Sequence, residues 1–286
     1  MLKRDKQMFT KAQQFIEKAE AVRKTHPEMG CRKIALKLKE RGFGRDKLEA
    51  LFLQSGFKII YPPNYMRTTQ SVRLHQFENL LEGLLVKGIN EVVQTDITYF
   101  WMKGRFAYLV FIIDVYSRLI IGYHAGLNLE AAANMKALEM MIKLRGKQNL
   151  KGLIHHSDRG SQYHSKLYVE KLKEHGIKIS MCDAAWQNAY TERINRTMKY
   201  EYLRHRKIDN IEKLRKYMKM DVKAYNTERP HWSLPHQMAP ATFENYLRNL
   251  ETSSGPEMKI YKHVQNIENE FFTAMQQSDK KIAATK

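Results

Sequence analysis

The sequence predicts an α/β protein in which a mixed five-stranded sheet is flanked by helices and preceded by an all-α region. Two patterns support this prediction. Apolar residues recur at helical spacing through the first 60 residues, and from residue 91 onwards they follow the alternation typical of strands. The strand-like segments then alternate with amphipathic helices, which is the pattern of a sheet covered by helices.

The first 60 residues are predicted to contain a helix-turn-helix unit. Two short amphipathic runs follow one another there, and Gly42 and Gly44 place a turn between them. Four basic side chains on these runs are candidate DNA contacts: Arg32, Lys33, Arg45 and Lys47. The alternative is a helical hairpin with solvated charges. The excess of positive charge favours DNA contact.

The sheet is predicted to begin at residue 91. Val93 and Ile97 share one face of the first strand, and Asp96 points to the other face. Residues 106–113 carry no charge and are mostly apolar, which indicates a strand buried on both faces. The remaining strands are expected at 119–123, 153–156 and 177–179, with helices at 131–142, 165–175 and from about 187. This succession of strands and helices is that of the ribonuclease H fold.

Five segments follow from these patterns. They are a helix-turn-helix-like DNA-binding region (1–60), a linker and connecting helix (61–90), a ribonuclease H-like core (91–208), a C-terminal helical extension (209–250) and a tail without an assigned role (251–286). The polar segment from Tyr225 to His231 is expected to be a loop.

Positive charge is in large excess. Lys and Arg total 49 against 30 Asp and Glu, which gives a net charge of +19. Such an excess points to a polyanionic partner. The basic residues lie inside segments with a folded apolar pattern rather than in a tail, so nucleic acid is favoured over an acidic membrane surface.

No membrane or secretory segment is predicted. No apolar run approaches the ~20 residues that a membrane helix needs, and the charged start of the chain has no apolar stretch behind it. We therefore expect a cytoplasmic protein without a membrane partner. Cys31 and Cys182 are too few and too distant for a disulfide framework or a zinc cluster.

Three carboxylates are candidate metal ligands. Asp96 lies in the middle of a strand, Asp158 just past the fourth strand and Glu192 on the late helix. The first and fourth strands of a ribonuclease H sheet are neighbours, so Asp96 and Asp158 should lie side by side. Two divalent cations ~3.5–4 Å apart can activate a nucleophile and neutralise phosphate charge. Three convergent carboxylates would therefore suit phosphodiester chemistry that depends on divalent cations.

The helix that carries Glu192 also presents basic groups. Its buried stripe is predicted from residues at i, i+4 and i+8, namely Tyr190, Ile194 and Met198. Glu192 faces away from that stripe, and three candidate DNA contacts share its face: Asn188, Arg196 and Lys199. The alternative is an exposed face with an ordinary Glu192–Arg196 ion pair, worth roughly a few tenths of a kcal/mol.

Other polar residues near these segments are expected to be structural. Asp114 ends the apolar second strand and is interpreted as a turn residue. His155 and His156 resemble metal ligands, but successive strand residues point to opposite faces, so at most one of them can approach Asp158.

Several segments together resemble one family. They are Thr95-Asp96-Ile97-Thr98-Tyr99, Ile113-Asp114-Val115-Tyr116-Ser117-Arg118, the run from His156 to Tyr163, and Tyr225-Asn226 with Arg229-Pro230-His231. The pattern resembles bacterial insertion-sequence transposases, in particular the second-frame (OrfB) proteins of the IS-three family, which share the retroviral-integrase (DDE) catalytic core. The likeness spans roughly residues 20–245.

The resemblance implies an acidic triad of Asp96, Asp158 and Glu192 that binds two Mg²⁺ ions. It also implies nicking of DNA that frees a 3′-hydroxyl, joining of that hydroxyl to another phosphodiester, and recognition of double-stranded DNA as terminal inverted repeats and target. A homo-multimer on DNA, a nucleoid-associated location in a bacterium and a fusion partner from an upstream frame are further expectations. Arg196 and Lys199 match basic residues that hold DNA ends in related integrases.

One departure and two alternatives accompany this interpretation. Thirty-three residues separate Asp158 from Glu192, fewer than the family usually has, and the shortfall lies in the loop before the helix. A catalytically inactive DNA-binding regulator from a decayed element is one alternative, and the intact carboxylates argue against it. A ribonuclease H-like nuclease without strand transfer is the other.

Overall fold

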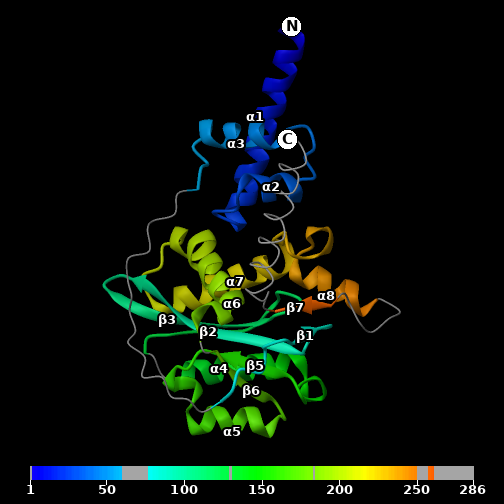
Figure 1. The fold of residues 1–286 in the computed structure, drawn as a ribbon. Coiled ribbons are helices and arrows are strands. Elements are labelled where there is room, and N and C mark those ends of the chain that lie inside the picture. The colour runs from blue at the N-terminus through cyan, green and yellow to red at the C-terminus, as the bar shows by residue number, and fades with distance from the viewer. Residues whose placement is uncertain (1, 60–76, 129–130, 183, 250–256, 261–286) are drawn as a thin grey trace, which may run out of the picture.

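The computed structural model describes residues 2–59, 77–128, 131–182, 184–249 and 257–260. A five-stranded sheet lies at its centre, with helices on both faces and a further helical unit beyond one of them (Figure 1). The fold class predicted from the sequence is thereby confirmed. Within the described residues, no helix is long and apolar enough to cross a membrane.

The sheet has the spatial order β4-β3-β2-β5-β6. Its strands are β2 (Val92–Met102), β3 (Arg105–Asp114), β4 (Ile120–Gly126), β5 (Ile154–Ser157) and β6 (Lys178–Met181). The first three form an antiparallel meander, while β5 runs parallel to β2, and β6 runs parallel to β5. Lys103 and Gly104, with φ of 38° and 85°, make the tight turn between β2 and β3, since two left-handed residues match the twist of a hairpin.

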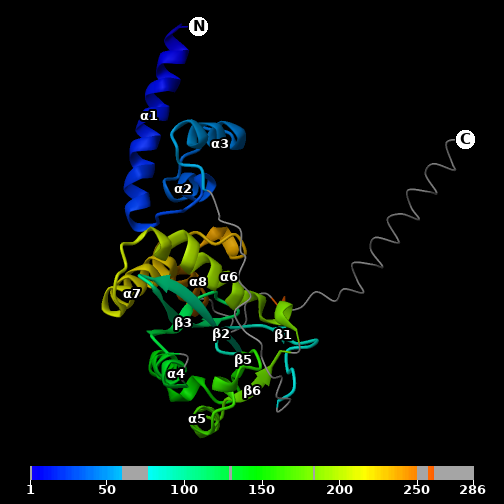
Figure 2. The same cartoon turned by 90° about the vertical axis from the view of Figure 1, so that its left-hand side faces the viewer.

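Helices cover both faces of the sheet. One face carries α4 (Ala131–Arg145) and α5 (Lys166–Glu174), and the other carries α6 (Ala189–Thr197), its π-helical continuation η4 (Met198–Tyr202) and α7 (Ile211–Glu228) (Figures 1 and 2). The two faces hold separate apolar cores. The arrangement is therefore a three-layer α/β/α sandwich.

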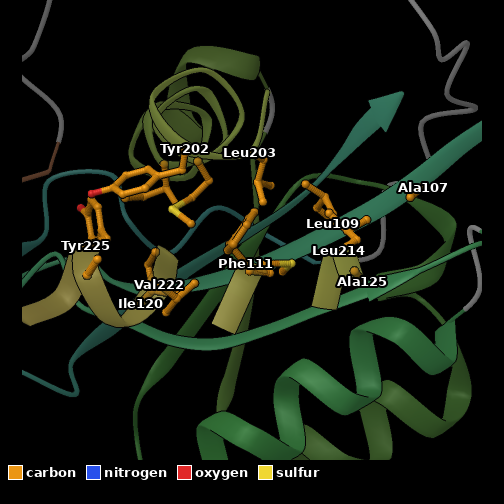
Figure 3. Close-up of a cluster of buried hydrophobic side chains, with 14 of the residues drawn as sticks. Ala107, Leu109, Phe111, Ile120, Ala125, Tyr202, Leu203, Leu214, Val222 and Tyr225 are labelled. Atoms are coloured by element: carbon orange, nitrogen blue, oxygen red, sulfur yellow. The ribbon is translucent and has the colours of Figure 1, made fainter. Parts of the chain in front are cut away.

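Strand β3 contributes to both apolar cores because successive side chains of a strand point to opposite faces. Leu109 and Phe111 pack with residues of η4 and α7 such as Tyr202 (Figure 3). Val110 and Ile112 pack against the α4 side. The uncharged run seen in the sequence is thus a strand buried on both faces, as predicted.

The helical unit consists of α1 (Leu2–Thr25), α2 (Cys31–Lys37) and α3 (Arg45–Gln54), which share a small apolar core of their own. The unit rests against the core through the turn between α1 and α2. The backbone N–H of Glu28 donates to the carbonyl oxygen of Glu201 at 2.9 Å, and His26 Nδ1 lies 2.9 Å from the hydroxyl of Tyr202. The predicted helices with a short turn between them are confirmed.

The helix expected within residues 77–90 does not form. Residues 77–84 make turns, and β1 (Leu85–Val86) pairs with β7 (Met258–Lys259). This pairing partner lies far along the chain, in the segment expected to be a tail, so periodicity near residue 85 does not reveal it. Residues 60–76 lie outside the described residues, as do residues 251–256 and 261–286 of the tail.

The segment expected to be a loop from Tyr225 is helical as far as Glu228. Asn226 explains part of the difference. Its side-chain amide donates to the carbonyl oxygen of Ile120 at 2.9 Å and accepts from the N–H of Ile120 at 3.0 Å. The polar groups that suggested a loop therefore bind α7 to strand β4.

A buried group of charges binds α8 (Pro240–Arg248) to the sheet. Arg145 donates to both carboxylate oxygens of Glu244, at 2.7 and 2.6 Å, and to Asp114 Oδ2 at 3.1 Å. The second oxygen of Asp114 accepts from the N–H groups of Tyr116 and Ser117, so Asp114 is the turn residue that the sequence predicted. All three charged side chains are at most 4% exposed. Residues 209–250 accordingly pack within the core rather than beside it.

We expect Arg145→Met to lower the free energy of unfolding by about 3–5 kcal/mol, because it leaves the buried Asp114 without a cation and leaves Glu244 only the exposed Arg248, 3.8 Å away. Urea unfolding followed by circular dichroism measures the change. Lys143→Met, on the exposed side of the same helix, is the matched control and should change stability by less than about 0.5 kcal/mol. Equal effects of the two substitutions would contradict the importance of the buried charges.

Candidate active site

Asp96 and Asp158 come from neighbouring parallel strands. In the pairing of β2 with β5, Gln94 lies opposite His156, and each aspartate follows two residues later. Asp96 points away from the face of Val93 and Ile97, towards the side covered by α6, as the alternation predicts. The strand order therefore places the two carboxylates side by side.

The carboxylate of Asp96 is held at both oxygens. Oδ1 accepts from the backbone N–H of Ile97 at 2.8 Å, and Oδ2 accepts from Asn195 Nδ2 at 2.9 Å. The sequence reasoning missed Asn195. It lies three residues after Glu192, and residues at i and i+3 are neighbours on a helix surface. That spacing is the signal that could have identified it.

Asp158 lies just past β5, where its Oδ1 accepts from the N–H of Gly160 at 3.1 Å. Glu192 is exposed in the first turn of α6. Burial raises the pKa of both carboxyl groups above the ordinary values. Among the described side chains, none of the three acids Asp96, Asp158 and Glu192 forms a salt bridge.

Electrostatic repulsion is strongest at Asp96. Burial, followed by the negative charge of Asp158, raises the pKa of the Asp96 carboxyl to about 8, and Glu192 adds to the shift. A buried carboxylate next to like charges becomes stable only when a proton or a cation compensates it. Oxygen ligands of this kind suit hard divalent cations. In the described part of the chain, however, no three acidic, histidine or cysteine side chains are close enough to hold one ion.

Asn188 does not lie where the sequence predicts. It is 3% exposed, its Nδ2 donates to the carbonyl oxygen of Thr95 at 2.9 Å, and its Oδ1 accepts from the hydroxyl of Thr191 at 2.7 Å. Helix α6 begins only at Ala189. The helical phase that placed Asn188 on the face of Glu192 therefore does not extend to it, and its amide is not available to DNA.

The shortened loop before α6 is attached to strand β2. Gln94, which is fully buried, donates to the carbonyl oxygen of Gln187 at 3.1 Å, and Asn188 binds the next residue of the strand. The side chain of Gln187 in turn accepts from the N–H of Ala184 at 3.1 Å. These contacts position the start of α6, and hence Glu192, relative to Asp96.

A cleft of about 1030 Å³ opens beside Asp96 and Glu192. Its cationic lining consists of Lys33, Arg193, Arg196, Lys199 and Arg229. Arg196 is exposed and Lys199 is half-buried. Burial lowers the pKa of Lys199, and the negative charge of Asp96 opposes that change. The predicted neighbours Arg196 and Lys199 thus share a cleft with two of the three acids.

The other basic candidates lie apart from the acids. Arg32 is exposed and donates to Glu49 at 2.6 Å, Arg45 pairs with Asp46, and Lys47 is exposed on α3. Only Lys33 departs from this set, since it turns towards the core and lines the cleft.

The two histidines of β5 have structural partners. His155 Nε2 lies 2.9 Å from the hydroxyl of Tyr168, and His156 Nδ1 lies 2.8 Å from the hydroxyl of Ser180. Burial lowers the pKa of His155 to about 4 and that of His156 to about 3. Both rings are neutral at pH 7, in agreement with the structural role expected from the sequence.

Comparison with known proteins identifies relatives. Residues 87–185 and 175–240 each match a family described as an integrase core domain. The chain is 33% identical over 230 residues to a 31 kDa protein of insertion element IS600 from Shigella sonnei, which covers 77% of this chain and 82% of that protein. It is 32% identical over 175 residues to the transposase InsF of insertion sequence IS3A from Escherichia coli K12, with 59% of each chain covered.

Solved structures give a more distant likeness. The catalytic core domain of HTLV-2 integrase, in complex with magnesium, has 16% identity and a TM-score of 0.43, with 54% of this chain and 96% of that chain covered. A likeness at this level does not bear on activity.

We expect Asp96→Asn to raise the melting temperature by roughly a few degrees in EDTA at about pH 9, where the Asp96 carboxyl is mostly ionised, because it removes a charge that burial and Asp158 disfavour. Mg²⁺ should stabilise the wild-type protein against heat and should have little effect on the variant. Differential scanning calorimetry with and without Mg²⁺ measures both effects. Asp209→Asn, at an exposed carboxylate far from the cleft, is the control. A lower melting temperature of Asp96→Asn in EDTA would contradict the inferred repulsion.

Proposed function

This chain belongs to the bacterial insertion-sequence transposases of the IS3 family, which have an integrase-like core, and from that membership we propose how it acts on DNA. It nicks the ends of its element and joins the freed 3′-hydroxyl to a second phosphodiester. Asp96, Asp158 and Glu192 form the acidic triad of this reaction.

The observation that carries the proposal is the convergence of acids at the mouth of a basic cleft. Burial raises the pKa of Asp96, and the charges of Asp158 and Glu192 raise it further, so Asp96 lies within electrostatic reach of both acids. Arg196 and Lys199 line the same cleft. Uncompensated carboxylates next to groups that bind phosphate are what the cleavage of a phosphodiester requires.

Asp96, Asp158 and Glu192 would hold divalent cations in this proposal, Mg²⁺ or Mn²⁺ in its place. When bound, such cations neutralise phosphate charge and make a water or hydroxyl oxygen a stronger nucleophile. The donor set fits because all its ligating atoms are carboxylate oxygens. Glu192 stands on the exposed first turn of α6, so it can complete the site from the side on which DNA enters.

Other side chains of the cleft orient the acids and the DNA. Asn195 and the N–H of Ile97 fix the plane of the Asp96 carboxylate, and the N–H of Gly160 fixes Asp158. Arg196 and Lys199 would bind phosphates on either side of the bond that is cut, since guanidinium and ammonium groups are the usual phosphate ligands of proteins.

The partners in this proposal are double-stranded DNA, as terminal inverted repeats and as target, and further copies of the chain on paired ends. The helical unit would contact the repeats through α3, where the charged side chains of Arg45 and Lys47 are exposed. Arg32, although paired with Glu49, stands on the adjoining helix. A fusion partner from an upstream frame would add a further DNA contact.

One experiment separates this function from its two alternatives. A labelled duplex that ends in the native inverted repeat is incubated with the protein and Mg²⁺, and the products are resolved by gel electrophoresis. We expect both nicked and joined strands. Nicking without joining would indicate a nuclease, and binding without nicking would indicate a regulator.

Glu192→Gln should reduce nicking by at least about a hundredfold while it leaves DNA binding almost unchanged, because the amide keeps the shape but loses the charge of the ligand. The same gel assay and a filter-binding assay measure the two properties. Glu212→Gln on α7 is the control for loss of an exposed glutamate in the first turn of a helix. Nicking at the wild-type rate by Glu192→Gln would remove Glu192 from the triad.

Lys199→Ala should weaken duplex binding and reduce the slope of log K against log salt concentration by about one, since one phosphate contact is lost. Fluorescence anisotropy at several salt concentrations gives the slope. Lys219→Ala, at an exposed lysine of α7 outside the cleft, should leave the slope unchanged. A slope as steep as that of the wild type would exclude Lys199 as a phosphate ligand.

A further inference from the structure

The cleft continues past the acids to the junction of the helical unit and the core. Three separate elements supply cations there: Lys33 from α2, Arg193 from α6 and Arg229 from the end of α7. Arg196 and Lys199 lie along the same cleft. One continuous basic lining therefore runs from the acidic triad to the helical unit.

Glu201 is the carboxylate that lines this end of the cleft and pairs with its cations. Its two oxygens accept from Nε and Nη2 of Arg229, each at 2.7 Å, and Lys33 Nζ lies 3.7 Å from Oε1. Arg193 is exposed, and no ion pair joins it to any side chain in the described part of the chain. Two of the three cations thus pair with Glu201, and Arg193 does not.

This end of the cleft accordingly is lined by more cations than carboxylates, in partly buried surroundings. Lys33 and Glu201 are 15% and 13% exposed at their side chains. Burial, together with the charges of Arg229 and Arg193, lowers the pKa of Lys33 to about 8. Like charges held close together in a place with little water repel one another more strongly than on an open surface. An anion that enters from the cleft would relieve this repulsion.

We propose that Lys33 and Arg193 form a binding site for a phosphate of the DNA backbone, distinct from the contacts of Arg196 and Lys199. Arg229 lies behind these two side chains and binds Glu201. Glu201 therefore neutralises part of the positive charge without pairing with Arg193. The inference rests on the proposed function, because the DNA is the substrate whose cut bond lies at the other end of the cleft.

This site changes the role of the helical unit. Lys33 leaves the set of side chains that would read DNA with α3 and instead completes the cleft of the core. The carbonyl oxygen of Glu201 also accepts from the N–H of Glu28, and Glu201 belongs to the continuation of the helix that carries Glu192. Docking of the helical unit and seating of DNA beside the acids therefore involve the same few residues.

The test measures binding without catalysis. A duplex of arbitrary sequence, roughly 30 base pairs long, is titrated in EDTA by fluorescence anisotropy at several salt concentrations. We expect Lys33→Ala and Arg193→Ala each to weaken binding roughly 3–10-fold and to reduce the salt slope by about one. Lys33→Arg should retain the slope. Arg193→Ala keeps the test valid if Lys33→Ala proves unstable, since Arg193 is exposed.

Lys37→Ala is the matched control. Lys37 also lies on α2 and also pairs with a glutamate of the core, at 2.9 Å from Glu228, but it does not line the cleft. Lys37→Ala should leave the salt slope unchanged. If it reduced the slope as much as Lys33→Ala, the effect would come from docking of the helical unit, and the proposed site would be overturned. Unchanged slopes for Lys33→Ala and Arg193→Ala would overturn it as well. Failure of the wild-type protein to bind any duplex would instead overturn the proposed function.

Discussion

Two neighbouring parallel strands, β2 and β5, place Asp96 and Asp158 side by side. Their parallel pairing depends on α4, which carries the chain from β4 at one end of the sheet across its face to β5. Once that register is set, the positions of the remaining groups follow. The loop before α6 is attached to β2 by Gln94, and Asn195 of α6 reaches the carboxylate of Asp96. Helix α6, which carries Glu192, is thus aligned directly on the strand that carries Asp96.

Two groups of like charge lie next to each other: the three carboxylates, and the cations that line the adjoining cleft. Burial, followed by the negative charge of Asp158, raises the pKa of Asp96 to about 8, and the cations of the adjoining cleft are in excess over Glu201. Each group could supply the counter-charge of the other. Within the described residues, however, no salt bridge joins the three carboxylates to these cations. A nucleic acid with divalent cations would compensate both groups at once, because phosphates suit the basic lining and the cations suit the carboxylates.

The sequence was sufficient for features that depend on local pattern. The alternation around Asp96 and the uncharged run of β3 report short-range geometry, and they predicted which faces of these strands are buried. The neighbouring positions of β2 and β5 were expected from the ribonuclease H succession of strands and helices. Features that depend on distant partners were not accessible. Nothing near Arg145 shows that Glu244 will meet it, and β1 cannot be predicted without β7. Asn188 was misplaced because a helical phase was extended past the start of α6, while Asn195 was overlooked although its spacing from Glu192 was regular.

The burial of Glu244 against Arg145 and Asp114 has a consequence for the synthesis of the protein. Glu244 lies close to the last described part of the core, so a chain still on the ribosome, or one that terminates early, has β3 and α4 but lacks the carboxylate that their charges require. The sheet and its acids would then remain poorly stabilised until α8 has emerged. A protein able to cut DNA would thereby acquire its stable form only when nearly all of its core has been translated.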